Sequence, residues 1–131
     1  QALTLFDYIH SLDNLKLATK ISVEQKKIKK KIKIFIQINI GKEEQKSGIF
    51  PERIDEFYKT CVNDLELNVI GLMCLPPKNI DNNQYFSLMN ILNQKIGLNE
   101  LSMGMSDDYM EALKHGATYL RIGSKIFGQR F

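Results

Sequence analysis

The sequence predicts an α/β fold built on a parallel sheet. Short runs of aliphatic and β-branched residues, typical of buried strands, alternate with segments of helical periodicity. Five such strands and four helices follow one another without an internal repeat or a linker. The length of 131 residues fits one domain or part of one. The pattern alone leaves open whether the sheet is doubly wound or part of a barrel.

The first strand is expected at residues 6–10, followed by a helix that begins between Ser11 and Asp13. The apolar stripe of this helix contains Leu15, Leu17, Ala18 and Ile21. The second strand is expected at residues 31–40, where isoleucines alternate with polar or aromatic residues. A loop follows at 41–48.

The next helix is expected to start near Pro51, a favoured residue in a first helical turn, and to include Cys61. The third strand, residues 69–75, is stopped by the pair Pro76-Pro77, and a helix follows at about 82–96. These elements repeat the order of strand and helix.

The last unit is a strand from Leu101, a helix over 107–115 and a strand over 118–122. Ser106 is a good N-cap for the helix, and Gly116 suits its C-terminal stop. A strand, helix and strand in one sheet imply a parallel pair, whose carboxyl ends lie at the same edge.

Small polar residues mark both of these strand ends: Ser106 after the first, Gly123 and Ser124 after the second. Hydroxyls and free backbone N–H groups gathered at one edge form an anion site suited to a phosphate. The simpler alternative is that Ser106 is only a cap and Gly123 only a turn residue. The residue types alone slightly favour that alternative.

Composition excludes several classes of protein. The hydrophobic fraction of 44% is that of an ordinary globular protein, and the net charge is only +3. Cys61 and Cys74 show neither metal spacing nor a disulfide framework, so we expect no metal and a reducing, cytoplasmic location. No apolar run approaches a membrane span and no signal peptide opens the chain, so no membrane partner is expected. Because the first residue is Gln1, we do not expect this to be the natural N-terminus.

The positive charge is concentrated in one lysine-rich stretch, residues 26–33. It has no interleaved aromatic residues and no nucleic-acid-binding motif. We therefore interpret it as a solvated helix end or loop and expect no nucleic-acid partner.

The segment 101–130, LSMGMSDDYMEALKHGATYLRIGSKIFGQR, closely resembles the C-terminal signature of the YggS/PROSC family of pyridoxal-phosphate homeostasis proteins. The resemblance extends back along the chain. Residues 9–13 resemble the family's IHSxD strand, and residues 71–73 its GLM strand. Asn39 and Ile40, followed by Lys46 and Gly48, resemble its VNI…ExxKxG segment.

The resemblance implies a fold: the C-terminal five strands of a (β/α)8 TIM barrel of the alanine racemase N-terminal-domain type. Residues 1–131 would then be a partial barrel domain with strands four to eight, and strands one to three would be absent. The family's lysine that binds the pyridoxal aldehyde covalently lies in the absent part. We expect Ile36, Ile38, Leu72 and Leu101 to face the barrel interior. Two open edges, at 6–10 and 118–122, would make the isolated chain marginally stable.

The resemblance also assigns cofactor-binding residues. Ser106, Gly123 and Ser124 match the phosphate cradle, with Ser124 standing where threonine is usual. Arg121 matches the arginine that faces the pyridine nitrogen, although a salt bridge to Glu43 or Glu100 is the alternative role. Asn39 and Met73 are possible neighbours of the cofactor, with core packing favoured for Met73.

The implied function is binding of pyridoxal 5′-phosphate in intracellular vitamin B6 homeostasis, in which the protein holds and hands on the cofactor without catalysis. The alternative is a pyridoxal-phosphate-dependent enzyme of the racemase or decarboxylase type. A racemase of this fold needs a second acid/base residue from an added β domain, and the sequence ends at Phe131. We therefore favour the non-catalytic role, with no catalytic residue. The oligomeric state stays open.

Overall fold

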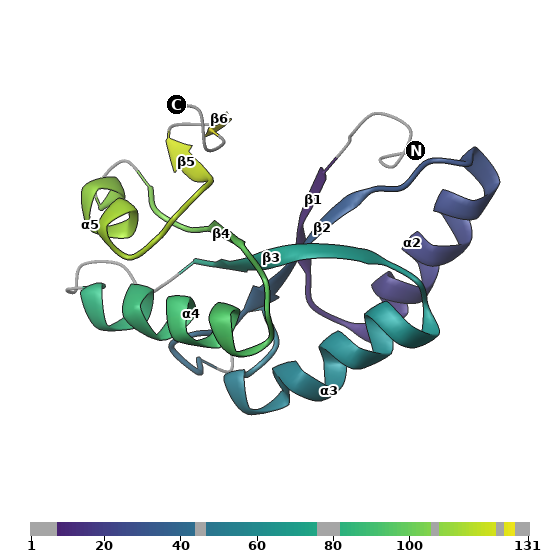
Figure 1. Cartoon of the computed structure of the whole chain (residues 1–131), viewed down its shortest axis with the longest axis horizontal. Coiled ribbons are helices and arrows are strands. Elements are labelled where there is room, and N and C mark those ends of the chain that lie inside the picture. The colour runs from purple at the N-terminus through teal and green to yellow at the C-terminus, as the bar shows by residue number, and fades with distance from the viewer. Residues whose placement is uncertain (1–7, 44–46, 76–81, 106–107, 123–124, 128–131) are drawn as a thin grey trace.

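The computed structural model describes residues 8–43, 47–75, 82–105, 108–122 and 125–127. Within them, a parallel sheet is formed in chain order by β1 (Tyr8–Leu12), β2 (Lys33–Ile38), β3 (Asn68–Cys74) and β4 (Glu100–Ser102). The connections contain the helices α2 (Leu15–Ile28), α3 (Ile54–Lys59), α4 (Asn83–Lys95) and α5 (Tyr109–Lys114), with short helical turns η1 (Pro51–Arg53) and η2 (Thr60–Asp64) on either side of α3. In Figure 1, α2, α3 and α4 lie along one side of the curved sheet. The predicted α/β organisation is confirmed.

The sheet continues towards β5 (Leu120–Ile122) through the residues that precede it. Ser102 and Tyr119 form a parallel bridge, and the Met103 N–H donates to the Tyr119 carbonyl at 3.1 Å. The Thr118 hydroxyl accepts from the Leu101 N–H at 2.8 Å. The chain therefore enters β5 as the parallel neighbour of β4.

A short strand that the sequence did not reveal, β6 (Lys125–Phe127), pairs antiparallel with β5. The expectation of an open edge at 118–122 was therefore wrong, because β6 supplies hydrogen-bond partners there. On the other side, β1 is the outer strand of the described sheet. The expected marginal stability of the isolated chain stays a prediction.

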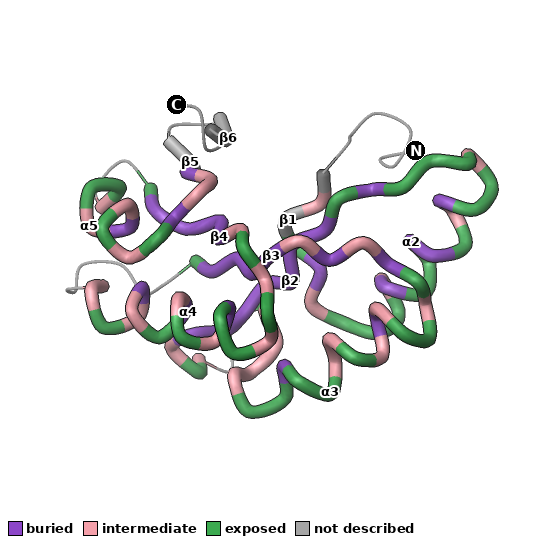
Figure 2. The backbone as a smooth tube through the Cα atoms, viewed as in Figure 1, coloured by how far each residue is buried: buried purple, intermediate pink, exposed green. Residues whose placement is uncertain are grey.

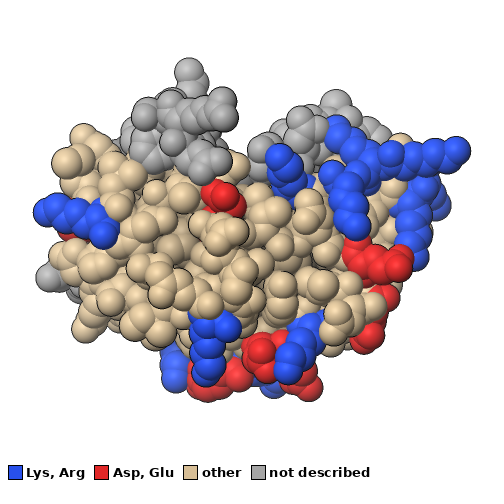
Figure 3. Space-filling view, viewed as in Figure 1, with Lys and Arg blue, Asp and Glu red and all other residues tan. Residues whose placement is uncertain are grey.

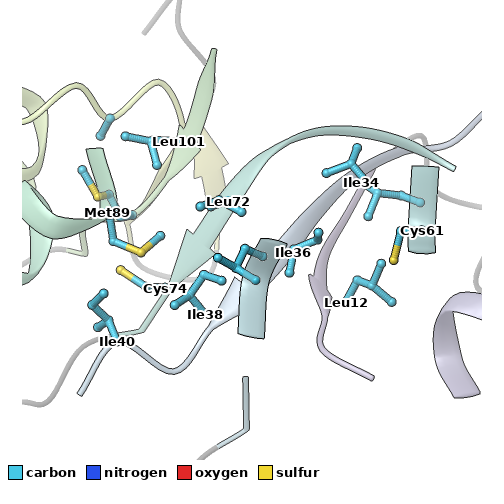
Figure 4. Close-up of a cluster of buried hydrophobic side chains, with 14 of the residues drawn as sticks. Leu12, Ile34, Ile36, Ile38, Ile40, Cys61, Leu72, Cys74, Met89 and Leu101 are labelled. Atoms are coloured by element: carbon cyan, nitrogen blue, oxygen red, sulfur yellow. The ribbon is translucent and has the colours of Figure 1, made fainter. Parts of the chain in front are cut away.

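One face of the sheet packs against the helices and forms the main core. Ile36 of β2 lies in register with Leu72 of β3, which lies in register with Leu101 of β4. These three residues belong to one buried cluster with residues of the helical segments: Ala18, Ile21, Ile54, Cys61, Phe86, Met89 and Ala112. Figure 4 shows part of this cluster, including Cys61 and Met89. The helices therefore pack against the face of the sheet that carries Ile36.

The opposite face is the concave one. Phe35 and Met73 are buried but do not belong to the cluster that contains the helical residues. The Phe35 ring meets the Tyr119 ring edge to face, with centroids 5.0 Å apart. Tyr119 lies next to β4, on the side away from β3, so it is three strand spacings from Phe35 in β2. In a flat sheet this distance between the two residues would be roughly 14 Å. The contact therefore requires the sheet to curl round this face, as in a barrel wall.

The expected orientation of four aliphatic residues was accordingly wrong. Ile36, Ile38, Leu72 and Leu101 face the helices and not the barrel interior. Residues 33–38 have the burial pattern of one exposed residue followed by five buried ones, so both faces of β2 are covered (Figure 2). Alternation identified two faces but could not say which one the helices cover.

Two helices start later than expected. Helix α2 has Asn14 as its N-cap, whose Oδ1 accepts from the Leu17 N–H at 2.8 Å, so Ser11 and Leu12 stay in β1. Helix α5 has Asp108 in the N-cap position in place of Ser106. The Gly116 stop is confirmed, because Gly116 follows the C-cap His115 with a φ of 97°. Among the described residues, none of the helices is long and apolar enough to span a membrane.

Candidate functional site at the carboxyl edge of the sheet

The candidate site lies where the parallel strands end. Of the predicted cofactor-binding residues, Ser106, Gly123 and Ser124 lie outside the described residues. The backbone of Arg121 is in β5, paired with Ile126, but its side chain is also outside the description. The expected roles of these four residues therefore remain to be tested.

The described backbone fixes where the strands bearing these residues end. Because the Ser102–Tyr119 bridge is parallel, the chain leaves β4 and β5 at the same edge of the sheet. Ser106 follows the end of β4 by four residues, and Gly123 directly follows Ile122, the end of β5. This parallel adjacency is the geometry that a shared anion site requires.

The segment after β4 is tightly held. Gly104 has a φ of 103°, which favours glycine, and a Cβ there would lie 2.7 Å from the Ala112 Cβ and 2.9 Å from the Leu120 Cδ2. The glycine thus allows the chain to pass close to α5 and β5. It sets the path of the backbone that leads to the predicted phosphate-binding residues.

Asp108 closes the same segment. Its Oδ1 accepts from the Met105 N–H at 2.8 Å, and its Oδ2 accepts from the Asn82 side-chain amide at 2.8 Å. Both oxygens of the carboxylate are therefore engaged by donors of the protein. Sequence reasoning assigned no role to Asn82 or Asp108 beyond helix starts.

Asn39, predicted as a cofactor neighbour, shapes the loop after β2. Its side-chain amide donates to the Glu43 carbonyl at 2.7 Å, and its Oδ1 accepts from the Glu43 N–H at 3.0 Å. Gly48 packs its α-carbon against this turn, since a Cβ there would lie 2.6 Å from the Asn39 nitrogen. These contacts give Asn39 and Gly48 structural roles. Met73 is buried, as favoured from the sequence.

A second carboxylate joins the loops after β1 and β2. Asp13, in the segment that resembles the IHSxD strand, accepts from the Gly48 N–H at 3.1 Å through Oδ2. This bond crosses 35 residues of sequence and fixes the return of the chain to Ile49, which bridges to Ile38. Asp13 thus joins the segments after β1 and β2, and Asp108 joins the segments after β3 and β4.

The lysine-rich stretch lies away from this edge, at the end of α2 and the start of β2 (Figure 3). Lys26 contacts Glu66 at 3.8 Å, and Lys27 contacts Glu24 at 3.5 Å, with the lysine side chains largely exposed. Exposed ion pairs of this kind contribute little to stability. The contacts are consistent with a solvated surface.

Two thiols are buried near the core. Burial raises the pKa of the Cys61 thiol to about 11. Burial also raises the pKa of Cys74 far above its ordinary range, and the nearby Asp108 carboxylate raises it further. Because the thiolate is the reactive form, both cysteines should be poor nucleophiles in the folded chain.

We predict that Cys61 reacts with iodoacetamide at pH 8 about a hundredfold more slowly in the native chain than in urea, since its pKa rises from 9.0 to about 11. Cys74 should react more slowly still, because burial and the Asp108 carboxylate raise the pKa of its thiol further than that of Cys61. Mass spectrometry of peptides from timed alkylation measures both rates. Equal rates in buffer and in urea would contradict the burial of these thiols.

No group of three or more potential metal ligands occurs among the residues that the structure describes. The polar side chains described at this edge include the carboxylates of Asp13 and Asp108 and the amides of Asn39 and Asn82. Each of them makes a hydrogen bond within the chain.

The chain belongs to the family described as alanine racemase, N-terminal domain, whose model matches residues 1–130. Within that class it is similar to proteins named pyridoxal phosphate homeostasis protein. It is 36% identical over 135 residues to the one from Pasteurella multocida, covering 95% of this chain. It is also 36% identical over 131 residues to the one from Aquifex aeolicus, covering 93% of this chain. The chain spans 58% of the length of each of these relatives.

A solved structure supports the same relationship. PipY of Synechococcus elongatus, with PLP bound, superposes with a TM-score of 0.83 at 26% identity, over 97% of this chain and 63% of that one. The structure of PipY without PLP superposes with a TM-score of 0.81. These matches confirm the family resemblance and the fold class inferred from the sequence.

Proposed function

We propose that this chain binds pyridoxal 5′-phosphate as part of a protein of vitamin B6 homeostasis. The observation that carries the proposal is the parallel adjacency of β4 and β5, which directs the residues after both strands to one edge. In (β/α)8 barrels, a phosphate group is frequently bound by the loops after the last two strands. The names of the relatives and the PLP in the PipY structure support the choice of ligand.

In this proposal, Ser106, Gly123 and Ser124 bind the phosphate group through hydroxyls and backbone N–H groups. Ser124 retains the hydroxyl of the usual threonine. Arg121 donates to the pyridine nitrogen and, as a permanent cation, keeps that nitrogen unprotonated. The ring of the cofactor can act as an electron sink, and an unprotonated nitrogen weakens that property, which suits a carrier.

One described residue, Asp108, bears on how a phosphate would be accepted at this edge. An acidic side chain next to a phosphate would repel it, and Asp108 is the carboxylate closest in sequence to Met105 among the described residues. Both of its oxygens accept hydrogen bonds from Met105 and Asn82. Its charge is thereby partly offset by donors of the protein.

We further propose that residues 1–131 form strands four to eight of the barrel. The share of 58% of the curated relatives is what a segment of that size would cover. In this proposal, as the family resemblance implies, the family lysine that binds the aldehyde has no counterpart among these 131 residues. Binding by this chain alone would then be noncovalent and would depend on the phosphate.

We propose that the protein holds and hands on the cofactor without turnover, in the reducing cytoplasm and without a nucleic-acid or membrane partner. The alternative, a racemase-like or decarboxylase-like enzyme, needs acid/base groups that act on an amino acid. Exchange of the α-proton of amino acids in D₂O, in the presence of PLP, discriminates the two. Sustained exchange above the rate with free PLP would favour the enzyme.

Removing both hydroxyls with Ser106→Ala and Ser124→Ala should weaken PLP binding strongly. A hydrogen bond to a charged group contributes roughly 1.5–3 kcal/mol, equivalent to about 10–100-fold in affinity for each residue. Fluorescence titration measures the dissociation constants of PLP and of pyridoxal, which has no phosphate. Ser124→Thr is the matched control, and it should bind PLP as the wild type does. Unchanged PLP affinity in the double variant would overturn these site assignments.

A further inference from the structure

Two residues that occupy N-cap positions do not cap their own helices. Asn82 precedes α4 and Asp108 precedes α5, yet neither side chain bonds to the first turn of its helix. Asparagine and aspartate are among the best N-cap residues, and each cap typically stabilises a helix by about 1 kcal/mol. Both helices lack this contribution, and the Asn82 side-chain amide instead donates to Asp108 Oδ2 at 2.8 Å.

The bond between Asn82 and Asp108 joins the segments that follow β3 and β4. Asp108 also binds the Met105 N–H at 2.8 Å, and its own N–H donates to the Met105 carbonyl at 3.1 Å. Met105 is thus bonded to Asp108 in both directions, and Asp108 is bonded to the start of α4. Gly104 next to it packs against α5 and β5. Residues 103–105 are therefore held on two sides.

We propose that the Asn82–Asp108 hydrogen bond positions the backbone of residues 103–105 for a phosphate-bearing ligand. The inference rests on the proposed function and adds two positioning residues that do not themselves touch the ligand. A site that binds an anion through backbone groups works only when its supporting contacts hold those groups in place. Loss of the bond should therefore reduce affinity for PLP and leave that for pyridoxal unchanged.

The pair allows a swap experiment. Asn82→Asp places a carboxylate against the Asp108 carboxylate and breaks the bond by repulsion. Combining Asn82→Asp with Asp108→Asn restores a donor and an acceptor, now in the reverse direction. The amide oxygen that this swap introduces at position 108 can still accept from the Met105 N–H. Gln94→Ala is the matched control, since it removes an exposed side-chain hydrogen bond to Asn90 on the same α4 helix.

We expect Asn82→Asp to raise the dissociation constant of PLP by about tenfold relative to pyridoxal, and the swap to recover most of this loss. Gln94→Ala should bind as the wild type does. A urea melt of each variant verifies folding. PLP binding that is unchanged in Asn82→Asp, or equally weakened for both ligands, or not recovered in the swap, would overturn the inference.

A second measurement needs no ligand and separates this inference from the proposed function. Amide hydrogen exchange at Met105 should be about tenfold faster in Asn82→Asp than in the wild type, and the wild-type rate should return in the swap. If the wild type shows no preference for PLP over pyridoxal, the proposed function fails, and Met105 exchange still decides the positioning role. Unchanged exchange at Met105 in Asn82→Asp would overturn that role.

Discussion

Gly71→Ala should destabilise the fold by about 3 kcal/mol or more, a large share of the roughly 5–15 kcal/mol by which domains are stable. Gly71 lies in β3 in register with Glu100 of β4. A Cβ at Gly71 would overlap the Glu100 carbonyl oxygen and approach the Glu100 carbonyl carbon to 2.7 Å. Because both of these atoms are backbone, the clash can be relieved only by separating the two strands. Urea denaturation followed by circular dichroism measures the loss.

Gly97→Ala is the control for this prediction. Position 97 favours glycine because of its φ of 81°, but a Cβ there would meet no atom within 4 Å. Its substitution should therefore show only the conformational penalty, of about 1–2 kcal/mol. A Gly71→Ala variant no less stable than Gly97→Ala would contradict the close approach of β3 and β4.

Leu72→Ala should lower the free energy of unfolding by about 2–5 kcal/mol, the range for removing a fully buried leucine side chain. Leu72 is 0% exposed and lies between Ile36 and Leu101 on the face that packs against the helices. The variant should form a cavity between sheet and helices, because the strands cannot move together without losing their register. The same denaturation experiment measures the effect.

Leu15→Ala is the matched control, because Leu15 is 53% exposed on α2 and should lose less than about 1 kcal/mol. A loss below about 1 kcal/mol for Leu72→Ala as well would contradict the assignment of this face as the core.

The order of the elements could be predicted from the sequence because their periodicities are strong. The helix expected at 82–96 is α4, Asn83–Lys95, and the strand expected at 69–75 is β3, Asn68–Cys74. Their boundaries are marked by local residues, such as proline and glycine, whose effects do not depend on distant parts of the chain. The strand β6 was missed because three residues carry too little pattern, and its partner β5 defines it.

Orientation and capping could not be predicted in the same way. Both faces of β2 are buried, so the isoleucine pattern did not reveal the face that the helices cover. Ser11, Asp13 and Asn14 are all good N-cap residues, and the sequence could not choose Asn14 among them. Asp13 instead bonds to Gly48, which lies 35 residues away. Tertiary contacts decided these positions.

The candidate site shows the same division. The placement of Ser106, Gly123 and Ser124 after two strands followed from periodicity, whereas their role and that of Arg121 came from the family resemblance. The Asn82–Asp108 bond left no signal beyond a residue type, because each residue precedes a helix and suggests a local cap. The two side chains bond to each other, and not to their own helices, only because the starts of α4 and α5 lie close together in the fold.

We propose above all that this chain binds pyridoxal 5′-phosphate through its phosphate group. The most direct test is to titrate the 131-residue chain with PLP and with pyridoxal, under identical conditions, and to compare the two dissociation constants. We expect PLP to bind at least about tenfold more tightly than pyridoxal and inorganic phosphate to compete with it. Equal affinity for the two ligands, with no competition by phosphate, would contradict this proposal.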